Sequence, residues 1–212
     1  MKKTLYLKFL LAYLIFAFFG FLVVATFTSS MLTEHLTRDR ANTLYREANL
    51  IATTFASDLY NNQMTMEAMK TQIDALDTFL QASIWIINPS GRVILDSDSP
   101  LDINSEVMVD NFDPTVTEGS FYTTGDFFGM FQEDVLSVFS PITNNYKVMG
   151  YVVILTPTST ILEECKSLLN ISYITLIILF VLSLIILLFF TEIVYIPLKK
   201  IRLNGPTNII TN

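Results

Sequence analysis

Two long apolar segments frame an acidic middle, and no other feature of this sequence restricts its fold as strongly. They run from Phe9 to about Phe27 and from Ile171 to Phe190, and neither contains a charged residue. A helix rises about 1.5 Å per residue, so about 20 apolar residues cover the roughly 30 Å hydrocarbon core of a bilayer. We therefore expect two transmembrane helices, at residues 9–28 and 166–191.

A secretory signal peptide is the main alternative for the first segment. Met1-Lys2-Lys3 before an apolar stretch is how such peptides begin. The apolar core, however, is longer than the usual length of about 7 to 15 residues, and Val23-Val24-Ala25 makes a poor small-residue cleavage site. We favour an uncleaved membrane anchor.

Charge is distributed unevenly along the chain. The part between the apolar segments carries 19 of the 20 Asp and Glu residues but only seven of the 13 Lys and Arg, a formal charge of −12. The other basic residues flank the segments: Lys2, Lys3, Lys8, Lys199, Lys200 and Arg202. Because cytoplasmic flanks of membrane spans favour Lys and Arg, we expect both termini in the cytoplasm and the middle of the chain outside the cell.

The middle part, residues 29–165, is long enough for one extramembrane domain with its own core. Its acidity argues against a nucleic-acid partner, which would need clustered Lys and Arg. Cys165 is the only cysteine, so no intrachain disulfide can form and the domain must be held together by packing. His35, the only histidine, provides no metal-site spacing.

Periodicity predicts two helices at the start of this domain. Residues 29–61 read as one helix that continues out of the membrane, and a shorter helix follows Asn61-Asn62. In both, apolar residues recur at steps of three and four and so share one face. These residues are Leu44, Ala48, Ile51, Phe55 and Leu59 in the first helix, and Met69, Ile73, Leu76 and Leu80 in the second.

The pattern then changes to that of a sheet. The β-branched and aromatic runs 83–87 and 92–95 are joined by Asn88-Pro89-Ser90-Gly91, which predicts a hairpin with a tight turn. A polar stretch at 96–117 is expected to be loop. Strand character returns in four later runs. The six runs are one more than the strands of the fold that we expect, an α+β fold with a five-stranded antiparallel sheet. The later runs are 120–123, 127–131, 135–139 and, after the Asn144-Asn145 turn, 147–156.

A last helix is expected to lead into the second span. Pro157 stops the preceding strand, and Thr160-Ile161-Leu162-Glu163 fits a capping box at a helix start. No helix breaker intervenes before Phe190. We expect one continuous helix from Thr160 through the membrane.

This order of elements resembles the extracellular PAS-like (single Cache) sensor domains of bacterial transmembrane receptors. Residues 84–97 look like the central hairpin of that family, and residues 138–142 and 148–154 look like its last two strands. The likeness covers about residues 29–165. It implies a receptor that senses a small molecule or cation outside the cell.

Residues 192–202 resemble the start of a HAMP linker, in which a proline just inside the membrane precedes Leu-x-x-Ile. Pro197 would loosen the helix, and Ile193, Leu198 and Ile201 would begin the seam of a parallel coiled coil. The combination looks most like the input half of a sensor histidine kinase. It implies a homodimer in the bilayer and a cytoplasmic response regulator as partner.

The chain departs from that family after the second span. Asn204-Gly205-Pro206 breaks the helix, residues 203–212 form an irregular tail, and no phosphoacceptor histidine or ATP-binding region follows. We expect truncation of a longer receptor rather than a short protein that lost its output. ATP and Mg²⁺ would belong to the missing kinase half, so we expect no cofactor and no enzyme activity in these 212 residues.

Two groups of residues are candidate sites, each with an ordinary alternative. Asp96, Asp98 and Asp102 bring together oxygen ligands that bind divalent cations, but they lack an EF-hand spacing, and we favour the alternative of a solvated loop. Several aromatic residues concentrate where PAS-like folds carry a ligand pocket: Phe112, Phe121, Tyr122, Phe127, Phe128 and Phe131. Such rings suit a pocket or a sheet core. If a pocket exists, we expect Tyr122, Asp126 and Phe128 to contact the ligand.

These expectations combine into one functional hypothesis and two alternatives. Ligand binding would shift the helix that starts near Thr160, and the shift would pass through the second span to Pro197 and a kinase. Alternatively, the same input serves a chemotaxis transducer or a cyclic-dinucleotide cyclase. The third hypothesis is a membrane-anchored binding protein without a signalling role.

Overall fold

A computed structural model describes residues 3–55, 58, 61, 64–101, 107–115, 120–190 and 193. They belong to two compact units. The α+β unit comprises Ser30–Cys165, and the helical unit comprises Met1–Ser29 with Lys166–Asn212. The predicted HAMP start with Pro197 (apart from Ile193), the predicted tail 203–212, and Asp102 of the predicted cation site lie outside the described residues.

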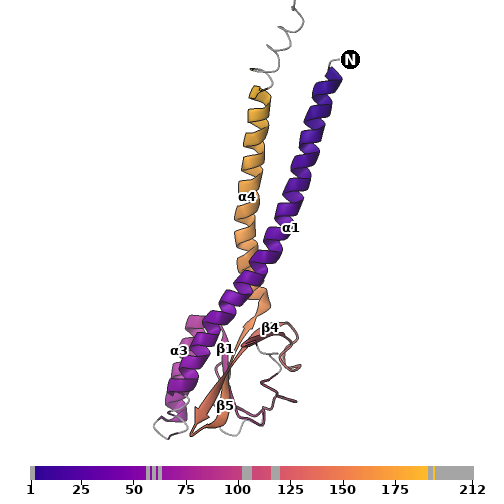
Figure 1. Cartoon of the computed structure of the whole chain (residues 1–212). Coiled ribbons are helices and arrows are strands. Elements are labelled where there is room, and N and C mark those ends of the chain that lie inside the picture. Colours follow the sequence, from indigo (N-terminus) through magenta and orange to yellow (C-terminus); the bar gives the residue numbers. More distant parts are fainter. Residues whose placement is uncertain are drawn as a thin grey trace, which may run out of the picture. The chain divides into compact units, whose positions relative to one another are not determined.

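The elements follow the predicted order of a long helix, a short helix, a sheet and a last helix (Figure 1). The sheet has five strands, all antiparallel, so the expected α+β fold is confirmed. The elements are α1 (Lys3–Leu50), a π-helix (Ile51–Phe55), α3 (Met66–Leu80), β1 (Ser83–Ile87), β2 (Val93–Asp96), β3 (Tyr122–Gly125), β4 (Val135–Asn144), β5 (Lys147–Pro157) and α4 (Thr158–Phe190).

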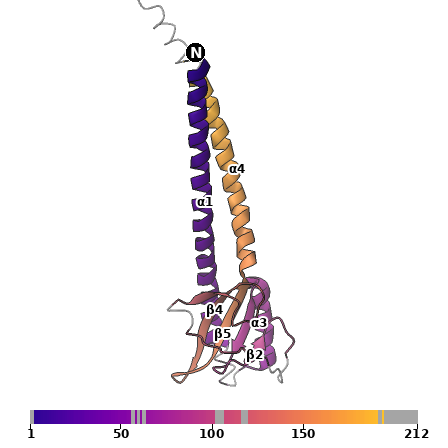
Figure 2. The same ribbon diagram turned by 90° about the vertical axis from the view of Figure 1, so that its right-hand side faces the viewer.

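The strand order is β2-β1-β5-β4-β3, which places the longest strand, β5, at the centre (Figure 2). Residues paired across neighbouring strands point to the same face, and successive residues alternate between faces. Ile84, Ile154 and Val138 therefore share one face of the sheet, while their neighbours Trp85, Val153 and Phe139 share the other.

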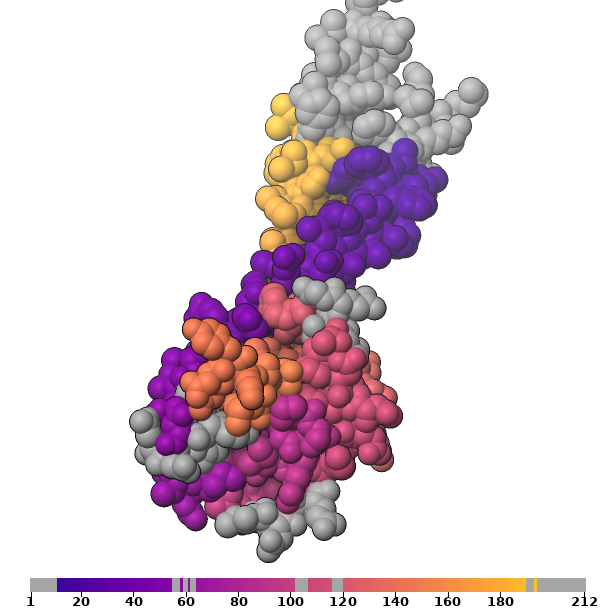
Figure 3. All heavy atoms as spheres, turned by 60° about the horizontal axis from the view of Figure 1, so that its bottom comes forward, coloured from indigo at the N-terminus to yellow at the C-terminus, as the bar shows by residue number. Residues whose placement is uncertain are grey.

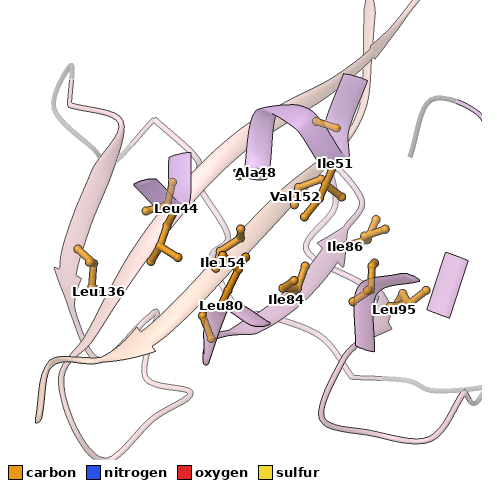
Figure 4. Close-up of a cluster of buried hydrophobic side chains, with 14 of the residues drawn as sticks. Leu44, Ala48, Ile51, Leu80, Ile84, Ile86, Leu95, Leu136, Val152 and Ile154 are labelled. Atoms are coloured by element: carbon orange, nitrogen blue, oxygen red, sulfur yellow. The ribbon is translucent and has the colours of Figure 1, made fainter. Parts of the chain in front are cut away.

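Helices cover the first of these faces. Figure 1 shows α3 and the part of α1 in this unit on one side of the sheet and the loops on the other. The predicted apolar stripes of both helices meet the sheet there, and Figure 4 shows several of their side chains converging with those of the strands. The buried members include Leu44, Ala48 and Ile51 of α1, Met69, Ile73 and Leu80 of α3, and Ile84, Ile86, Leu136, Val152 and Ile154 of the strands.

The first helix is not α-helical over its whole predicted length. It passes after Leu50 into the π-helix, whose wider turn holds one more residue than an α-helical turn. Adjacent residues can then face the same side, and both Ile51 and Ala52 are buried, at 0% and 1% exposure. The side chains of Phe55 and Leu59 lie outside the described part.

The β1–β2 hairpin turns where the sequence predicts. The Asn88 side-chain oxygen accepts hydrogen bonds from the backbone N–H groups of Ser90 (3.0 Å) and Arg92 (2.9 Å). Gly91 has φ +89° and lies against a crossing segment, where its carbonyl accepts a bond from Val109 N at 2.8 Å. The turn thus also anchors the loop that follows β2.

Of the six predicted strand runs, 127–131 is wrong. These residues form a turn, in which Phe127 and Phe128 are left-handed (φ 46° and 57°) and Met130 N bonds to Phe127 O at 3.1 Å. Aromatic residues favour strands only where a pleated surface receives them. Here the chain must instead fold back to bring its phenylalanines onto one face of the sheet.

Strand β4 is longer than predicted and continues to Asn144. It includes Pro141, which lacks a backbone N–H, but β3 pairs with β4 only as far as Val138. Pro141 therefore lies where one side of β4 is an edge, a position that tolerates proline. The β4–β5 turn forms as predicted, with left-handed Asn145 and Tyr146, and Figure 3 shows it in orange at the surface.

Helix α4 starts at Thr158, two residues before the predicted capping box, and follows β5 without a linker. The backbone N–H and the hydroxyl of Thr158 both donate to the carbonyl of Asp134, at 2.9 and 2.8 Å. Ser159 donates to the carboxylate of Glu133 at 3.2 Å. A tertiary contact therefore sets this helix start, which local sequence does not reveal.

The helical unit contains the two apolar segments. Both α1 and α4 are long and apolar enough to cross a membrane. Within this unit, Tyr13 stacks on Phe180 with ring centroids 6.4 Å apart, and Phe21 approaches Tyr173 at 6.3 Å. The hydroxyls of Tyr13 and Ser183 share a hydrogen bond. The two segments therefore pack as a pair of helices.

Candidate functional site

The face of the sheet opposite the helices carries an aromatic cluster. Side chains from β1, β2, β4 and β5 form its floor, and segments 107–115 and 126–131 cover it. The buried members are Trp85, Ile87, Val93, Val109, Phe127, Val135, Phe139, Val153 and Leu155, with Phe112, Phe128, Phe131 and Tyr151 packed around them. We call this set the aromatic cluster.

Ring contacts connect the cluster. Trp85 makes an edge contact with Phe127 at 5.7 Å and a tilted contact with Phe131 at 5.8 Å. Phe127 in turn stacks on Phe139 at 6.1 Å. Phe112 meets Phe128 and Tyr151, each at 5.7 Å. Such pairs stabilise beyond their buried area, so these rings form a second core of the unit.

The three predicted ligand contacts do not come together. Tyr122 pairs with Val138 and lies on the helix-covered face, where its ring contacts Phe121 at 5.3 Å. Phe128 belongs to the aromatic cluster on the opposite face. Asp126 is exposed, and its backbone carbonyl accepts a hydrogen bond from Phe131 N at 3.1 Å. Their role in ligand binding stays a prediction.

Among the described residues, two buried polar groups on the aromatic face have no hydrogen-bond partner. They are the indole Nε1 of Trp85, whose residue is 7% exposed, and the hydroxyl of Ser137, 1% exposed. Buried polar groups are nearly always paired, so each is a notable exception. Neither residue stands out as a site residue in the sequence. The sequence offered two signals: a serine within the apolar run of β4, and the chain's single tryptophan, which lies in β1.

The predicted cation ligands Asp96 and Asp98 lie at the end of β2. The Asp96 carboxylate accepts hydrogen bonds from the backbone N–H of Asp98 (2.9 Å) and the hydroxyl of Ser99 (2.8 Å), which closes a turn. Asp98 is exposed. No group of three His, Cys, Asp or Glu residues suited to a metal occurs among the described residues, and Asp102 is not one of them. The cation site stays a prediction.

A cavity of about 360 Å³ lies beside this turn. Its lining is mostly apolar, with Asp96 and Ser99 as its polar contributors. The other lining residues are Val93, Ile94, Leu95, Pro100, Leu101 and Val107.

Among the acids that the structure describes, Asp113 has a shifted pKa. The pKa of Asp113 is lowered by the Thr115 hydroxyl, which donates to its carboxylate at 2.6 Å, and by the Thr115 backbone N–H at 2.8 Å. The group is fully exposed, so its negative charge faces solvent.

The predicted relay residue Thr160 lies in the first turn of α4. This turn is attached to the α+β unit by the Thr158–Asp134 hydrogen bonds and by Ile161, which is buried in the helix-side core. One turn later, Cys165 is buried and shares a 3.2 Å hydrogen bond with Thr33 of α1. The start of α4 is therefore fixed to its surroundings on several sides.

The sequence matches no protein-family model, and it matches no curated protein. Among solved structures, it is similar to the sensor domain of the histidine kinase DctB of V. cholerae, at 20% identity and a TM-score of 0.40 over 62% of this chain and 58% of that one. It is also similar to the sensory domain of the Campylobacter jejuni chemoreceptor Tlp3, at 12% identity and a TM-score of 0.45 over 66% and 62%.

The ligand-binding domain of the same chemoreceptor in complex with L-norvaline gives 14% identity and a TM-score of 0.48 over 66% of this chain and 61% of that chain. The chain thus spans about three-fifths of the length of these solved domains.

Proposed function

We propose that this chain is the signal-sensing input module of a transmembrane receptor. The observation that carries the proposal is the direct passage from β5, the central strand of the sheet, into α4 at Pro157–Thr158. Helix α4 then runs unbroken to Phe190 and contains the second apolar segment. One element thus belongs both to the extramembrane fold and to a candidate span.

This connection suits transmission of a conformational change. With no linker after β5, a shift of the sheet is not absorbed before α4, and hydrogen bonds at Thr158 with burial of Ile161 attach the helix start to the fold. A helix of this kind transmits translation and rotation along its axis. A ligand changes the output only to the extent that it binds one arrangement better than the other.

The proposed orientation places the α+β unit outside the cell and both termini in the cytoplasm. The concentration of Lys and Arg beyond both apolar segments and of Asp and Glu between them supports it. Its test is thiol labelling of single cysteines placed at Asp98 and at Lys200, with Cys165→Ser as background. Labelling of both positions from the same side of the membrane would overturn the orientation.

For the output we favour a histidine kinase, reached through a HAMP linker that begins at residues 192–202, in a homodimer that phosphorylates a response regulator. The resemblance of residues 192–201 to a HAMP start supports this choice. A chemotaxis transducer or a cyclic-dinucleotide cyclase would use the same input. The coding sequence that follows residue 212 in the genome distinguishes these outputs.

A fusion to a kinase transmitter tests the relay itself. Deleting one residue within 167–170 rotates the inner end of α4 by about 100° and shortens it by about 1.5 Å. Deleting all four residues rotates it by only about 40° but shortens it by about 6 Å. A rotation-sensitive relay predicts the larger change of kinase output for the single deletion, and a piston predicts it for the fourfold deletion.

Unchanged output in both fusions, with the protein present in the membrane, would contradict the proposed function. It would favour the remaining alternative, a membrane-anchored binding protein without a signalling role. In that case the α+β unit would bind its partner with the same affinity in the parent protein and in both deletion variants of α4.

A further inference from the structure

The unpaired N–H of Trp85 is the starting point for a binding site on the aromatic face. Trp85 lies on β1 and Ser137 on β4, and the strand register directs both side chains to this face. Both polar groups are buried, and neither has a hydrogen-bond partner in the part of the chain that the structure describes. The T-shaped contact of Trp85 with Phe127 is a weaker interaction than an N–H···O hydrogen bond. A molecule that brings an acceptor would therefore gain a bond that the protein itself does not make.

Of the two segments that cover the aromatic face, the loop of residues 126–131 is the one that can move away from the sheet. Two successive non-glycine residues, Phe127 and Phe128, adopt left-handed backbone conformations, which cost free energy unless the surroundings enforce them. The backbone bonds of this described segment, Met130 N to Phe127 O and Phe131 N to Asp126 O, close the loop on itself. Ring contacts, rather than backbone bonds to the sheet, hold it over Trp85.

The chemistry of the face restricts the ligand. Among the described residues, the buried polar ones are Ser137, Ser140 and Thr156, and no charged side chain is buried. A charged ligand group would lose its hydration on this face without gaining a counter-ion, which is unfavourable. An aromatic ring of a ligand, in contrast, can make edge-on and face-on contacts with the rings of the aromatic cluster.

We propose that the aromatic face binds an uncharged aromatic molecule with a hydrogen-bond acceptor. Its ring takes the place of the Phe127 side chain, and its acceptor receives the Trp85 Nε1–H. Displacement of Phe127 moves the loop of residues 126–131 outward. The site deepens the proposed function, on which its signalling role rests, because it names the ligand class.

The same loop leads directly to the start of α4. Three residues after Phe131, the carbonyl of Asp134 accepts both hydrogen bonds from Thr158. The neighbouring Glu133 accepts one from Ser159. Outward movement of the loop therefore pulls on the residues that fix the first turn of α4, which couples the site to the helix.

The test uses the only tryptophan as a reporter. Because the chain contains one tryptophan, the full protein in lipid nanodiscs gives a single indole N–H signal by NMR. The probes are benzamide, which has a ring and a neutral acceptor, benzoate, which has a charged acceptor, and benzylamine, which is a cation without an acceptor. Benzamide is expected to shift the indole signal downfield and saturably. Benzoate is expected to bind about tenfold more weakly or worse, and benzylamine to give no saturable shift.

Variants separate occupation of the site from general stability. Phe127→Leu removes the competing ring while keeping an apolar side chain, and it is expected to tighten benzamide binding by about tenfold. Trp85→Phe, followed through ligand signals, is expected to weaken it by about tenfold because the donor is lost. Phe79→Ala, at an exposed position of α3 (79%), is the matched control and is expected to change nothing.

No saturable indole shift with benzamide, or tighter binding of benzoate than of benzamide, would overturn the proposed site. Weaker binding in Phe127→Leu would overturn the displacement of that ring. Failure here is distinguishable from failure of the proposed function, because the α4 deletions in the kinase fusion test the relay without any ligand.

Discussion

Replacing Gly91 by alanine provides a quantitative test of the β1–β2 turn. A Cβ atom at this position would lie 2.6 Å from the carbonyl oxygen of Val109 and 3.0 Å from Cβ of Phe112. Gly129 is a matched control, because it also has a positive φ (+76°, against +89° at Gly91) but nothing lies within 4 Å of its added Cβ. The two substitutions share backbone strain and differ in the collision.

The expected losses follow from these contacts. An L residue in the left-handed region costs about 1 kcal/mol at either position. At Gly91 the Val109 carbonyl must also retreat by about 0.4 Å to reach even 3.0 Å. That movement stretches the 2.8 Å bond from Val109 N to Gly91 O, a bond worth about 1 kcal/mol. We expect a loss of about 2 to 3 kcal/mol for Gly91→Ala and about 1 kcal/mol for Gly129→Ala.

The assay is guanidinium unfolding of the full chain in micelles, followed by the emission of Trp85, which lies on β1 beside this turn. Asparagine variants separate the two causes, since asparagine tolerates the left-handed region but keeps a Cβ. Gly129→Asn should be close to the parent protein, whereas Gly91→Asn should remain destabilised. Equal losses for Gly91→Ala and Gly129→Ala would refute the steric argument.

Three further predictions concern the core, the helical unit and an exposed acid. Ile154→Ala, in the fully buried centre of β5, should destabilise by about 3 kcal/mol in the same unfolding assay, whereas Val148→Ala at the exposed end of that strand should have little effect. Ser183→Ala and Tyr13→Phe should each cost about 0.6 kcal/mol in a dodecyl sulfate titration, and the double variant no more than either, because both remove one hydrogen bond. NMR titration should give Asp113 a pKa below 3.8, and Thr115→Val should raise it; any stabilisation from this group is present above its unfolded pKa and is lost as the pH falls through the lowered one.

The spacing of apolar residues along the sequence made the buried faces of the helices predictable. Leu44 and Ala48, like Met69 and Ile73, lie four residues apart, and the structure buries each pair against the sheet. The same spacing does not reveal the π-helix. The extra residue in its turn changes which positions face the sheet, and nothing in the residue types of this segment indicates that change. Ile51 and Ala52 are both buried only because the turn widens there.

The aromatic residues show why the site was harder to predict than the fold. Aromatic content indicates burial but not which face of a sheet receives a ring. Tyr122 lies before the turn at Asp126 and pairs with Val138, which places its side chain on the helix-covered face. Phe128 lies after the start of that turn and packs on the opposite face. Whether the Trp85 indole N–H and the Ser137 hydroxyl find a partner among the described residues depends on neighbours from distant parts of the chain. A local sequence pattern therefore cannot predict that both are unpaired.

Geometry also favours the loop between β3 and β4 over the β4–β5 hairpin as the origin of a signal. The exposed hairpin turn at Tyr146 is separated from α4 by the full length of β5, Lys147–Pro157, which at about 3.3 Å per residue is roughly 35 Å of paired strand. A disturbance there must move a central strand that is hydrogen-bonded on both sides. Residues 126–134 need no such path, because they cover Trp85 at one end and bind Thr158 at the other. A small movement of this loop therefore reaches α4 while the sheet stays intact.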